Sequence, residues 1–289
     1  MDKIIIEARI NEYQMRTVNP NVPWTVDEIV ENAVAAREAG ASILHFHARK
    51  EDGSPDNTSE AYAGIIKAVR RETDILLLPT LGFNSNDKTG KDRIKIISRI
   101  AEDPETRPDL IPLDTGSVNL EFWNAEERRF ENEDSVYMNP TDVLLYCAEE
   151  MKKYGIKVKM TCWDMGFVRR GRLMVEENLI TSPGYFLFHL TEGHMITGHP
   201  CTRIGVDALR SVLPGNSIWS VNCVGGDLFK VIPYVVENGG NVAIGIGDYH
   251  YKEYGCPTNR ELIEKVVDIA KEKGRTPATP EEARALLGM

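Results

Sequence analysis

Short apolar runs recur along the whole chain, and longer stretches in which apolar residues repeat every three or four positions separate them. The short runs are rich in Val, Ile, Leu and Phe, which favours β-strands, whereas the longer stretches have the period of amphipathic helices. We predict strands over residues 3–10, 41–48, 74–81, 110–115, 157–163, 185–191, 217–224 and 241–247. Strands that alternate with helices in this way are typical of a parallel sheet covered by helices.

Two of the predicted helices carry clear signals for their ends. In "TVDEIVENAVAAREAG", Thr25 can cap a helix, Glu28 completes a capping box three residues later, and Gly40 marks the end. A last short helix, "TPEEARALLG", has the same cap in Thr279 and Glu282. These signals fix where the first and the last helix begin.

About eight strand-helix units in 289 residues, with no Pro/Ser-rich linker between them, fit one (β/α)8 barrel better than a doubly wound sheet. We therefore expect an α/β fold in which residues 1–289 form a single TIM-barrel domain with a short C-terminal helix. An additional hairpin or loop, rich in charged and aromatic residues, is expected at residues 120–139.

Composition narrows the classes of function. The formal net charge of −10 argues against nucleic acid as a partner, and no apolar run approaches the roughly 18 residues that cross a membrane. The apolar run near the start has three residues, too few for a secretory signal, so we expect a cytoplasmic protein. Five cysteines without a C-x-x-C pair predict reduced thiols.

The stretch "ASILHFHARK" places two histidines near the end of the second predicted strand. In a barrel of this kind the active site is built at the C-terminal ends of the strands. The apolar positions of this strand should face the helices, which leaves His45, His47 and Arg49 pointing inward. Two imidazoles two residues apart converge on one point, as zinc or another divalent transition metal requires. Two hydrogen-bonded core histidines are the alternative.

Alternation on the first strand places Glu7, Arg9 and Asn11 on the inner face. Polar residues also follow other strands, and they either bind a substrate or cap turns and helices. They include Thr80 and Gly82 in "PTLGFN", Asp114 in "DTGSVN" and Asp248 in "IGDYH".

Gly225 and Gly226 open the seventh predicted helix, where barrels often bind phosphate through backbone N–H groups. A tight turn from strand to helix explains the two glycines equally well. Both interpretations stay open from the sequence.

Several segments resemble the β-keto acid cleavage enzymes, a family that includes the 3-keto-5-aminohexanoate cleavage enzyme of lysine fermentation. They are "NPNVPWTVDEI", "AGASILHFHAR", "GSVN", "GGNVAIGIGD" and "NRELIEKVVDIAKEKGRTPATPEEAR", so the similarity spans nearly the whole chain. The resemblance implies a zinc-containing (β/α)8 barrel and a homo-oligomer. It also implies an enzyme that converts a small-molecule β-keto acid and acetyl-CoA into acetoacetate and a new CoA thioester.

By this resemblance, His45 and His47 match the family's two zinc histidines, and Asp248 matches an aspartate that we expect to be the catalytic base. The eighth strand departs from the family pattern, because Ala243 replaces an arginine and Gly247 replaces a zinc-binding glutamate.

Three further departures concern substrate binding. Tyr13, Pro79 and Pro112 stand where the lysine-fermentation enzyme has a glutamate, a serine and a threonine. These replacements argue against aminohexanoate as the substrate.

The eighth strand lacks an arginine and a glutamate of the family pattern. The first strand, its neighbour in a closed barrel, carries one residue of each type, Arg9 and Glu7. We expect Glu7 to be the third metal ligand, with Glu12 as the second choice. A buried Glu7 and Arg9 ion pair without a catalytic part is the alternative. Room for the longer side chains would come from the small residues Ala243, Gly245 and Gly247.

We further expect Arg9, or else Arg49, to hold the carboxylate of the substrate, because a guanidinium matches it bidentately. The phosphates of CoA are expected near Gly225 and Gly226. The residues expected to bind the substrate are Asn11, Glu12, Arg49, Thr80, Gly82 and Asp114.

Two other functions are compatible with the sequence. One is a metal-dependent hydrolase of the amidohydrolase type, because those barrels also carry a strand with the H-x-H pattern. The other is a non-catalytic binding barrel that lost its activity with the eighth-strand glutamate.

Overall fold

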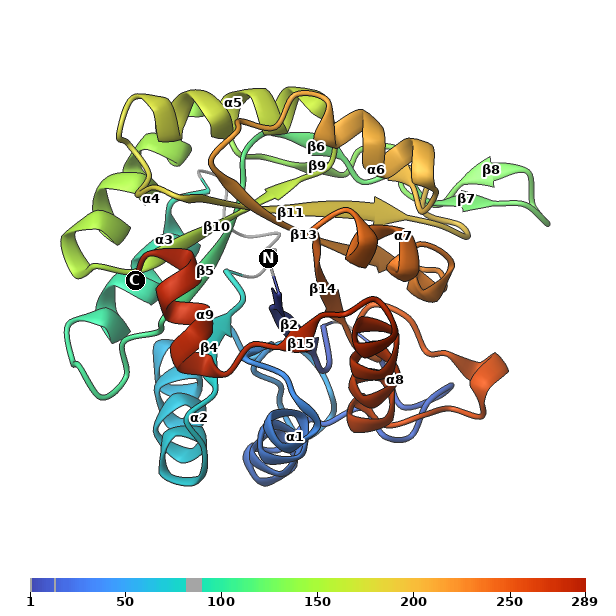
Figure 1. The fold of residues 1–289 in the computed structure, drawn as a ribbon, viewed down its shortest axis with the longest axis horizontal. Helices are drawn as coiled ribbons and strands as arrows, with labels where there is room; N and C mark the ends of the chain where they lie inside the picture. The colour runs from blue at the N-terminus through green and yellow to red at the C-terminus, as the bar shows by residue number, and fades with distance from the viewer. Residues whose placement is uncertain (1, 13, 82–89) are drawn as a thin grey trace.

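Eight parallel strands form a barrel in the computed structural model, which describes residues 2–12, 14–81 and 90–289 (Figure 1). Each strand overlaps its predicted range, so the prediction of a TIM barrel is confirmed. The hydrogen-bonded order is β4, β3, β2, β14, β13, β11, β10, β5. The strands are β2 (Ile6–Arg9), β3 (Ile43–Phe46), β4 (Leu76–Pro79), β5 (Leu110–Asp114), β10 (Lys157–Cys162), β11 (Gly184–Thr191), β13 (Ser217–Val224) and β14 (Asn241–Ile244).

Between β4 and β5 the barrel is closed by two hydrogen bonds of Asp109 rather than by a strand ladder. The backbone N–H of Leu77 donates to Oδ2 of Asp109 at 2.8 Å, and the N–H of Asp109 donates to the carbonyl oxygen of Leu77 at 3.0 Å. Asp109 thus supplies an acceptor that a ladder would have provided, and the ring of strands is nearly complete.

Helices surround the strands on the outside (Figure 1). The first helix has the predicted capping box of Thr25 and Glu28 and ends at Gly40 in a left-handed conformation, and the last helix has the box of Thr279 and Glu282. The helices are α1 (Val26–Ala39), α2 (Ser59–Glu72), α3 (Asp92–Ala101), α4 (Thr141–Tyr154), α5 (Met165–Glu176), α6 (Arg203–Arg210), α7 (Ile232–Glu237), α8 (Asn259–Glu272) and α9 (Pro280–Leu287), with short 3-10 turns η1 (Leu228–Lys230) and η2 (Lys252–Tyr254).

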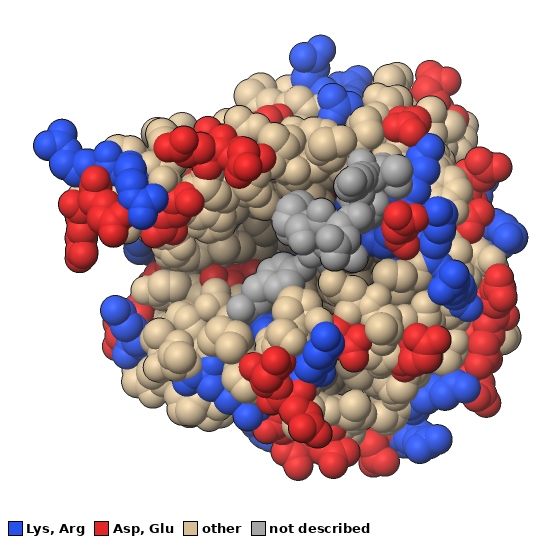
Figure 2. Space-filling view, turned by 180° about the vertical axis from the view of Figure 1, so that it is seen from behind, with Lys and Arg blue, Asp and Glu red and all other residues tan. Residues whose placement is uncertain are grey.

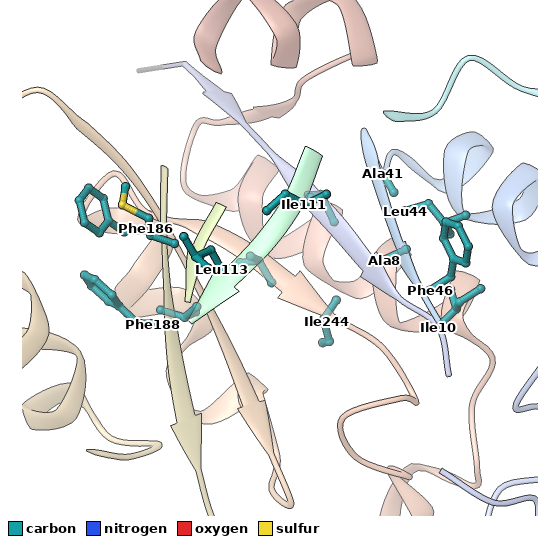
Figure 3. Packing of buried hydrophobic residues seen from close by; sticks show 14 of the residues in the cluster. Ala8, Ile10, Ala41, Leu44, Phe46, Ile111, Leu113, Phe186, Phe188 and Ile244 are labelled. Carbon is teal, nitrogen blue, oxygen red and sulfur yellow. The ribbon is translucent and has the colours of Figure 1, made fainter. Parts of the chain in front are cut away.

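The core has two parts. Outward-facing side chains such as Leu44, Phe46 and Phe186 pack between the strands and the helices (Figure 3). Inside the barrel, a second cluster joins Ile5, directly before β2, and apolar strand residues to Ala283 and Leu287 of α9; its strand members include Ile43, Leu76, Leu78, Leu110, Tyr185 and Ile218. Helix α9 therefore plugs one end of the barrel, and the inward polar residues lie toward the other end.

Short strands extend the barrel. Strand β1 (Lys3–Ile4) pairs with β15 (Thr276–Pro277), and β12 (His199–Pro200) pairs with β11. After β5, β6 (Val118–Asn119) pairs with β9 (Val136–Tyr137), and β7 (Trp123–Asn124) pairs with β8 (Arg129–Phe130). This extension confirms the hairpin predicted at residues 120–139. The β7–β8 hairpin projects from the barrel (Figure 1).

Within the described part of the chain, none of the helices combines the length and the apolar character that a membrane crossing demands.

Candidate metal and active site

A cavity of about 370 Å³ opens at the C-terminal ends of the barrel strands. Figure 2 shows the hollow on the face opposite to that seen in Figure 1. Every barrel strand, or the segment directly after it, contributes to the lining, as the barrel fold predicts. One lining residue from each of the eight is Arg9, His45, Thr80, Asp114, Thr161, His189, Val224 and Asp248.

Glu12, His45 and His47 form a group that can hold a metal ion. Oε1 of Glu12 lies 2.9 Å from Nε2 of His45, and Oε2 lies 2.7 Å from Nε2 of His47. The histidine side chains are 3% and 4% exposed, as expected for inward positions on β3. Two imidazoles and one carboxylate are a donor set that zinc accepts.

The hydrogen bond of His45 orients this group. Nδ1 of His45 lies 2.8 Å from the carbonyl oxygen of Leu78, which can only accept, so Nδ1 carries a proton and Nε2 is the nitrogen that faces Glu12. A ring nitrogen this close to a carboxylate oxygen shares either a proton or a metal ion with it. The residues therefore fit a divalent metal ion.

The charges at this site suit a metal as well. Burial lowers the pKa of His47 to about 4, so its ring is neutral at pH 7, the form that binds metals. Burial alone raises the pKa of Glu12, but the positive charge of Arg9 holds it well below its usual value. Glu12 is thus an anion.

Arg49 holds the loop that carries Glu12. Its Nη2 donates to the carbonyl oxygens of Asn11 and Gln14, each at 3.1 Å, and to that of Glu12. Glu12 itself has a φ of 36°, in the left-handed region that non-glycine residues rarely adopt. Since the guanidinium binds this backbone, the expectation that Arg49 holds the substrate is corrected: it positions Glu12.

Glu7 does not reach the histidines. Oε1 of Glu7 accepts from Nη1 of Arg9 at 3.1 Å, and Oε2 pairs with Nζ of Lys159, whose side chain is fully buried. Burial alone raises the pKa of Glu7, but Lys159 and Arg9 hold it below its usual value. The expectation that Glu7 is the third ligand is therefore corrected, and Glu12, the second choice, is the carboxylate at the histidines.

Arg9 lies at the centre of three carboxylates. Besides Glu7, it contacts Oδ2 of Asp248 through Nε at 2.8 Å and Oε1 of Glu12 through Nη2 at 2.5 Å. A guanidinium engaged in this way is no longer the bidentate clamp for a substrate that we expected. Instead Arg9 joins Asp248 to Glu12.

Asp248 lines the cavity and has one carboxylate oxygen without a hydrogen bond among the described residues. Its Oδ2 accepts from Arg9 and, at 3.1 Å, from Nδ2 of Asn222. Its Oδ1 is buried and has no hydrogen-bond partner among the described residues. Burial raises the pKa of Asp248 to about 6. A carboxylate with a raised pKa and one unused oxygen is suited to general-base catalysis.

The side-chain amide of Asn11 is engaged in hydrogen bonds to the backbone. Its Nδ2 donates to the carbonyl oxygens of Pro23 and His47 at 3.0 and 2.9 Å, and its Oδ1 accepts from the N–H of His47 at 2.9 Å. The expectation that Asn11 binds substrate is corrected, because its amide ties the end of β2 to His47. Of the other expected residues, Thr80 lines the cavity, and Gly82 lies outside the described residues, as does Tyr13.

Gly225 and Gly226 lie in the turn after β13, and Gly225 lines the cavity. The N–H of Gly225 donates to the carbonyl oxygen of Asp248 at 3.1 Å, and its φ is 80°. A side chain at Gly226 would meet the carboxylate of Glu192. Binding of the CoA phosphates at Gly225 and Gly226 stays a prediction.

The small residues of β14 and the turn after it make room for backbone. A Cβ at Gly245 would lie 1.9 Å from the carbonyl oxygen of Arg9, and one at Gly247 would lie 2.8 Å from that oxygen and from the N atoms of Asn11 and Glu12. The space that we assigned to the side chains of Glu7 and Arg9 is thus filled by the main chain of residues 9–12.

Two site residues were missed in the sequence. Lys159 and Asn222 alternate with the apolar residues of β10 and β13, so the same alternation that identified His45 could have found them. The cavity is also lined by His189, whose ring is tilted against Trp163 with centroids 4.1 Å apart and whose pKa burial lowers to about 3. His189 does not belong to the metal-binding group.

Comparisons with known proteins identify the family of the chain. The family model for beta-keto acid cleavage enzymes matches residues 3–289. The 3-keto-5-aminohexanoate cleavage enzyme of Acetoanaerobium sticklandii is 30% identical over 293 residues, which cover 100% of this chain and 99% of that protein. The 3-oxoadipate:acetyl-CoA acetyltransferase of Cupriavidus necator is 30% identical over 275 residues, which cover 94% and 89%.

Among solved structures, ObcA in a ternary complex with a C4-CoA adduct and oxalate has the same fold. Its TM-score is 0.73 at 15% identity, and the match covers 93% of this chain and 68% of that one. The family match over residues 3–289 and the 30% identity to the Acetoanaerobium sticklandii enzyme over the whole chain show that the chain belongs to the β-keto acid cleavage enzyme family.

Proposed function

We propose that the protein cleaves a β-keto acid with acetyl-CoA as co-substrate, giving acetoacetate and a new acyl-CoA. We further propose that it needs a divalent transition metal, zinc in the first place, held by Glu12, His45 and His47. The observation that carries this proposal is that the Glu12 carboxylate faces both histidine Nε2 atoms in a cavity that Asp248 also lines. The names of the two relatives support the reaction class.

A metal ion at these three residues would supply a Lewis acid that polarises the oxygens of the β-keto acid and stabilises the negative charge that develops on them. The remaining chemistry belongs to the side chains of the cavity.

Asp248 is the base in this proposal. Its Oδ1 removes a proton from the C2 methylene of the β-keto acid, and the carbanion attacks the acetyl carbon of acetyl-CoA, from which the CoA thiolate leaves. The thiolate then adds to the original keto carbon, and the bond between that carbon and C2 breaks. Asp248 returns the proton to C2. The products are acetoacetate and the CoA thioester of the remaining acyl group.

Arg9 and Asn222 keep Asp248 in place for both proton transfers. Their donors hold Oδ2 at 2.8 and 3.1 Å, which directs Oδ1 away from them. Because Arg9 also contacts Glu12, it fixes the base relative to the metal ligand. We therefore assign Arg9 a positioning role in place of substrate binding.

The two alternative functions have weaker support. A hydrolase of the amidohydrolase type needs histidines from further strands at the metal, but His189 packs against Trp163 outside the metal-binding group. The inert binding barrel was suggested by the loss of the eighth-strand glutamate, and Glu12 provides a carboxylate in its place.

The proposal also covers the domain organisation, location, assembly and partners of the enzyme. We infer a single domain over residues 1–289, a cytoplasmic location, assembly into a homo-oligomer, and small molecules rather than nucleic acids or membranes as partners. The net charge of −10 supports the absence of nucleic acid.

The test is an assay of acetoacetate formation with acetyl-CoA and a panel of β-keto acids, together with the metal content of the protein. We expect one zinc per chain and turnover that stops when a chelator removes it. Asp248→Asn should abolish turnover and leave the zinc content unchanged. Full turnover of the metal-free protein, or product formation without acetyl-CoA, would contradict the proposal.

A further inference from the structure

His189 is a buried histidine of the cavity wall to which the proposed mechanism assigns no role. It lies on β11 at a position that lines the cavity, and it is 8% exposed. Trp163 packs against its ring, with the ring centroids 4.1 Å apart and the planes tilted by 46°. A polar ring that is buried and held in this way, at the wall of a substrate cavity, is a candidate for contact with a ligand.

The ring of His189 is neutral at pH 7. Burial lowers its pKa to about 3, and the positive charges of Arg9 and Lys159 act in the same direction. The negative charge of Glu12 and the contact with Asn222 act against them without restoring the usual value. A neutral imidazole has one N–H donor and one nitrogen with a lone pair, and its neighbours decide which nitrogen has which.

Asn222 is the neighbour that decides. It is the partner of His189 in the register of β11 and β13, and the two side chains interact. Nδ2 of Asn222 donates to Oδ2 of Asp248 at 3.1 Å, which leaves Oδ1 as its acceptor. Oδ1 of Asn222 and Nδ1 of His189 are both buried, and neither forms a regular hydrogen bond in the described part of the chain. The two atoms complement each other as acceptor and donor, which places the proton of His189 on Nδ1 and the lone pair on Nε2.

His189 and the metal-binding histidines lie on opposite sides of the barrel. Strand β11 is the fourth strand from β3 in the ring of eight, and β14, which Asp248 follows, lies midway between the two. In the proposed reaction the β-keto acid has its oxygens at the metal and its C2 at Asp248. The acetyl group that C2 attacks therefore has to approach from the side of β11.

Of the two proposed substrates, acetyl-CoA is the one with a hydrogen-bond donor beside its reacting group. The amide N–H of its cysteamine unit is separated from the sulfur by two methylene groups, whereas the ionised β-keto acid has no N–H or O–H at its carboxylate, C2 or keto group. We propose that Nε2 of His189 accepts a hydrogen bond from this amide N–H and so places the acetyl carbon next to C2. The inference rests on the proposed function and names the part of the acetyl donor that β11 recognises. Because the ring stays neutral, it accepts this bond without taking the C2 proton that Asp248 removes.

The experiment compares two short acetyl donors in the zinc-loaded enzyme, with the best β-keto acid of the panel. They are S-acetyl-N-acetylcysteamine, which keeps the amide, and 2-(acetylthio)ethyl acetate, in which an ester oxygen replaces the N–H. We expect kcat/KM for the amide donor to exceed that for the ester donor by about 10-fold, because the ester leaves a buried acceptor without its hydrogen bond. If acetyl transfer from these short donors is slow, their inhibition constants against acetyl-CoA report the same preference.

His189→Phe keeps an aromatic ring against Trp163 and removes the acceptor. It should bring the ratio between the amide donor and the ester donor close to one, mainly through KM of the donor, while KM of the β-keto acid stays unchanged. His189→Leu repeats the test without the ring. His199→Phe is the matched control, because His199 lies on β12, outside the described lining of the cavity, and it should keep the ratio of the parent enzyme.

Two outcomes would overturn the inference: the parent enzyme uses both donors equally well, or His189→Phe retains the preference of the parent. The second outcome would mean that His189 acts only on Asp248 through Asn222, since such an effect changes kcat/KM for both donors by one common factor. Either result would leave cleavage with acetyl-CoA itself intact. If none of the β-keto acids is cleaved with acetyl-CoA, the proposed function itself fails, so the two failures are distinguishable.

Discussion

Nε2 of His47 lies 2.7 Å from Oε2 of Glu12, although Glu12 follows β2 and His47 follows β3. The contact depends on a turn in the chain directly after β2, where Glu12 takes up a left-handed backbone conformation. The carboxylate of the candidate metal site is therefore supplied by a loop, and the loop is held by Arg49.

The first prediction concerns Glu12. Glu12→Ala should lower the affinity for zinc by more than roughly 100-fold, because even the loss of residues that only support a ligand costs about 10- to 100-fold. Zinc titration with a chromophoric competitor measures the change. Glu253→Ala, an exposed glutamate of η2, is the control and should bind zinc like the parent protein. Stoichiometric tight zinc in Glu12→Ala would show that the carboxylate is not a ligand.

The second prediction is a pH profile. Asp248 must be deprotonated to act as a base, and burial raises its pKa to about 6. At saturating zinc, kcat/KM should fall about tenfold per pH unit below that value and level off above it. His47, whose pKa is lowered to about 4, stays neutral through this window. A profile that remains flat from pH 7 to pH 5 would rule out Asp248 as the titrating base.

The third prediction addresses the buried pair of Glu7 and Lys159, both fully buried. Lys159→Met should reduce the free energy of unfolding by roughly 3–5 kcal/mol, because it leaves Glu7 as a buried charge with one partner fewer. The double variant Glu7→Leu/Lys159→Met should lose less than the sum of the single changes. Urea denaturation measures each value. Strictly additive losses would mean that the two groups do not depend on each other.

The fourth prediction separates positioning from substrate binding at Arg49. Arg49→Lys should weaken zinc binding by about 10- to 100-fold, because a single ammonium cannot bond to the carbonyl oxygens of Asn11, Glu12 and Gln14 together. With zinc restored to saturation, KM for the β-keto acid should be near that of the parent enzyme. A large rise in KM at full zinc occupancy would instead support the original expectation that Arg49 binds the substrate.

The barrel and the two histidines could be predicted from the sequence because both depend on alternation within single strands. Leu44 and Phe46 face the helices, so His45 between them has to face the interior. The same rule placed Glu7 and Arg9 correctly inside the barrel. It could not show what they meet there, because Lys159 is 152 residues away from Glu7 in sequence.

Glu12 was only the second choice for the third metal ligand, for a local reason. Alternation ends where the strand ends, and Glu12 lies three residues after β2 with a φ that strand geometry does not allow. Asn11 was misjudged for a related reason: its side chain points inward but binds the backbone of His47 and Pro23. The role of a polar residue at a strand end can thus be assigned only when the backbone groups around its side chain are known.

The absence of a side chain at Gly247 allows the main chain of residues 9–12 to take its present path. A Cβ there would sit 2.8 Å from main-chain atoms of Arg9, Asn11 and Glu12, and backbone cannot move aside as a side-chain tip does. A glutamate at position 247 and the present path of residues 9–12 therefore exclude each other. A single substitution that placed a glutamate at position 247 would therefore shift the main chain that carries Glu12 and exchange one carboxylate for the other rather than add a second.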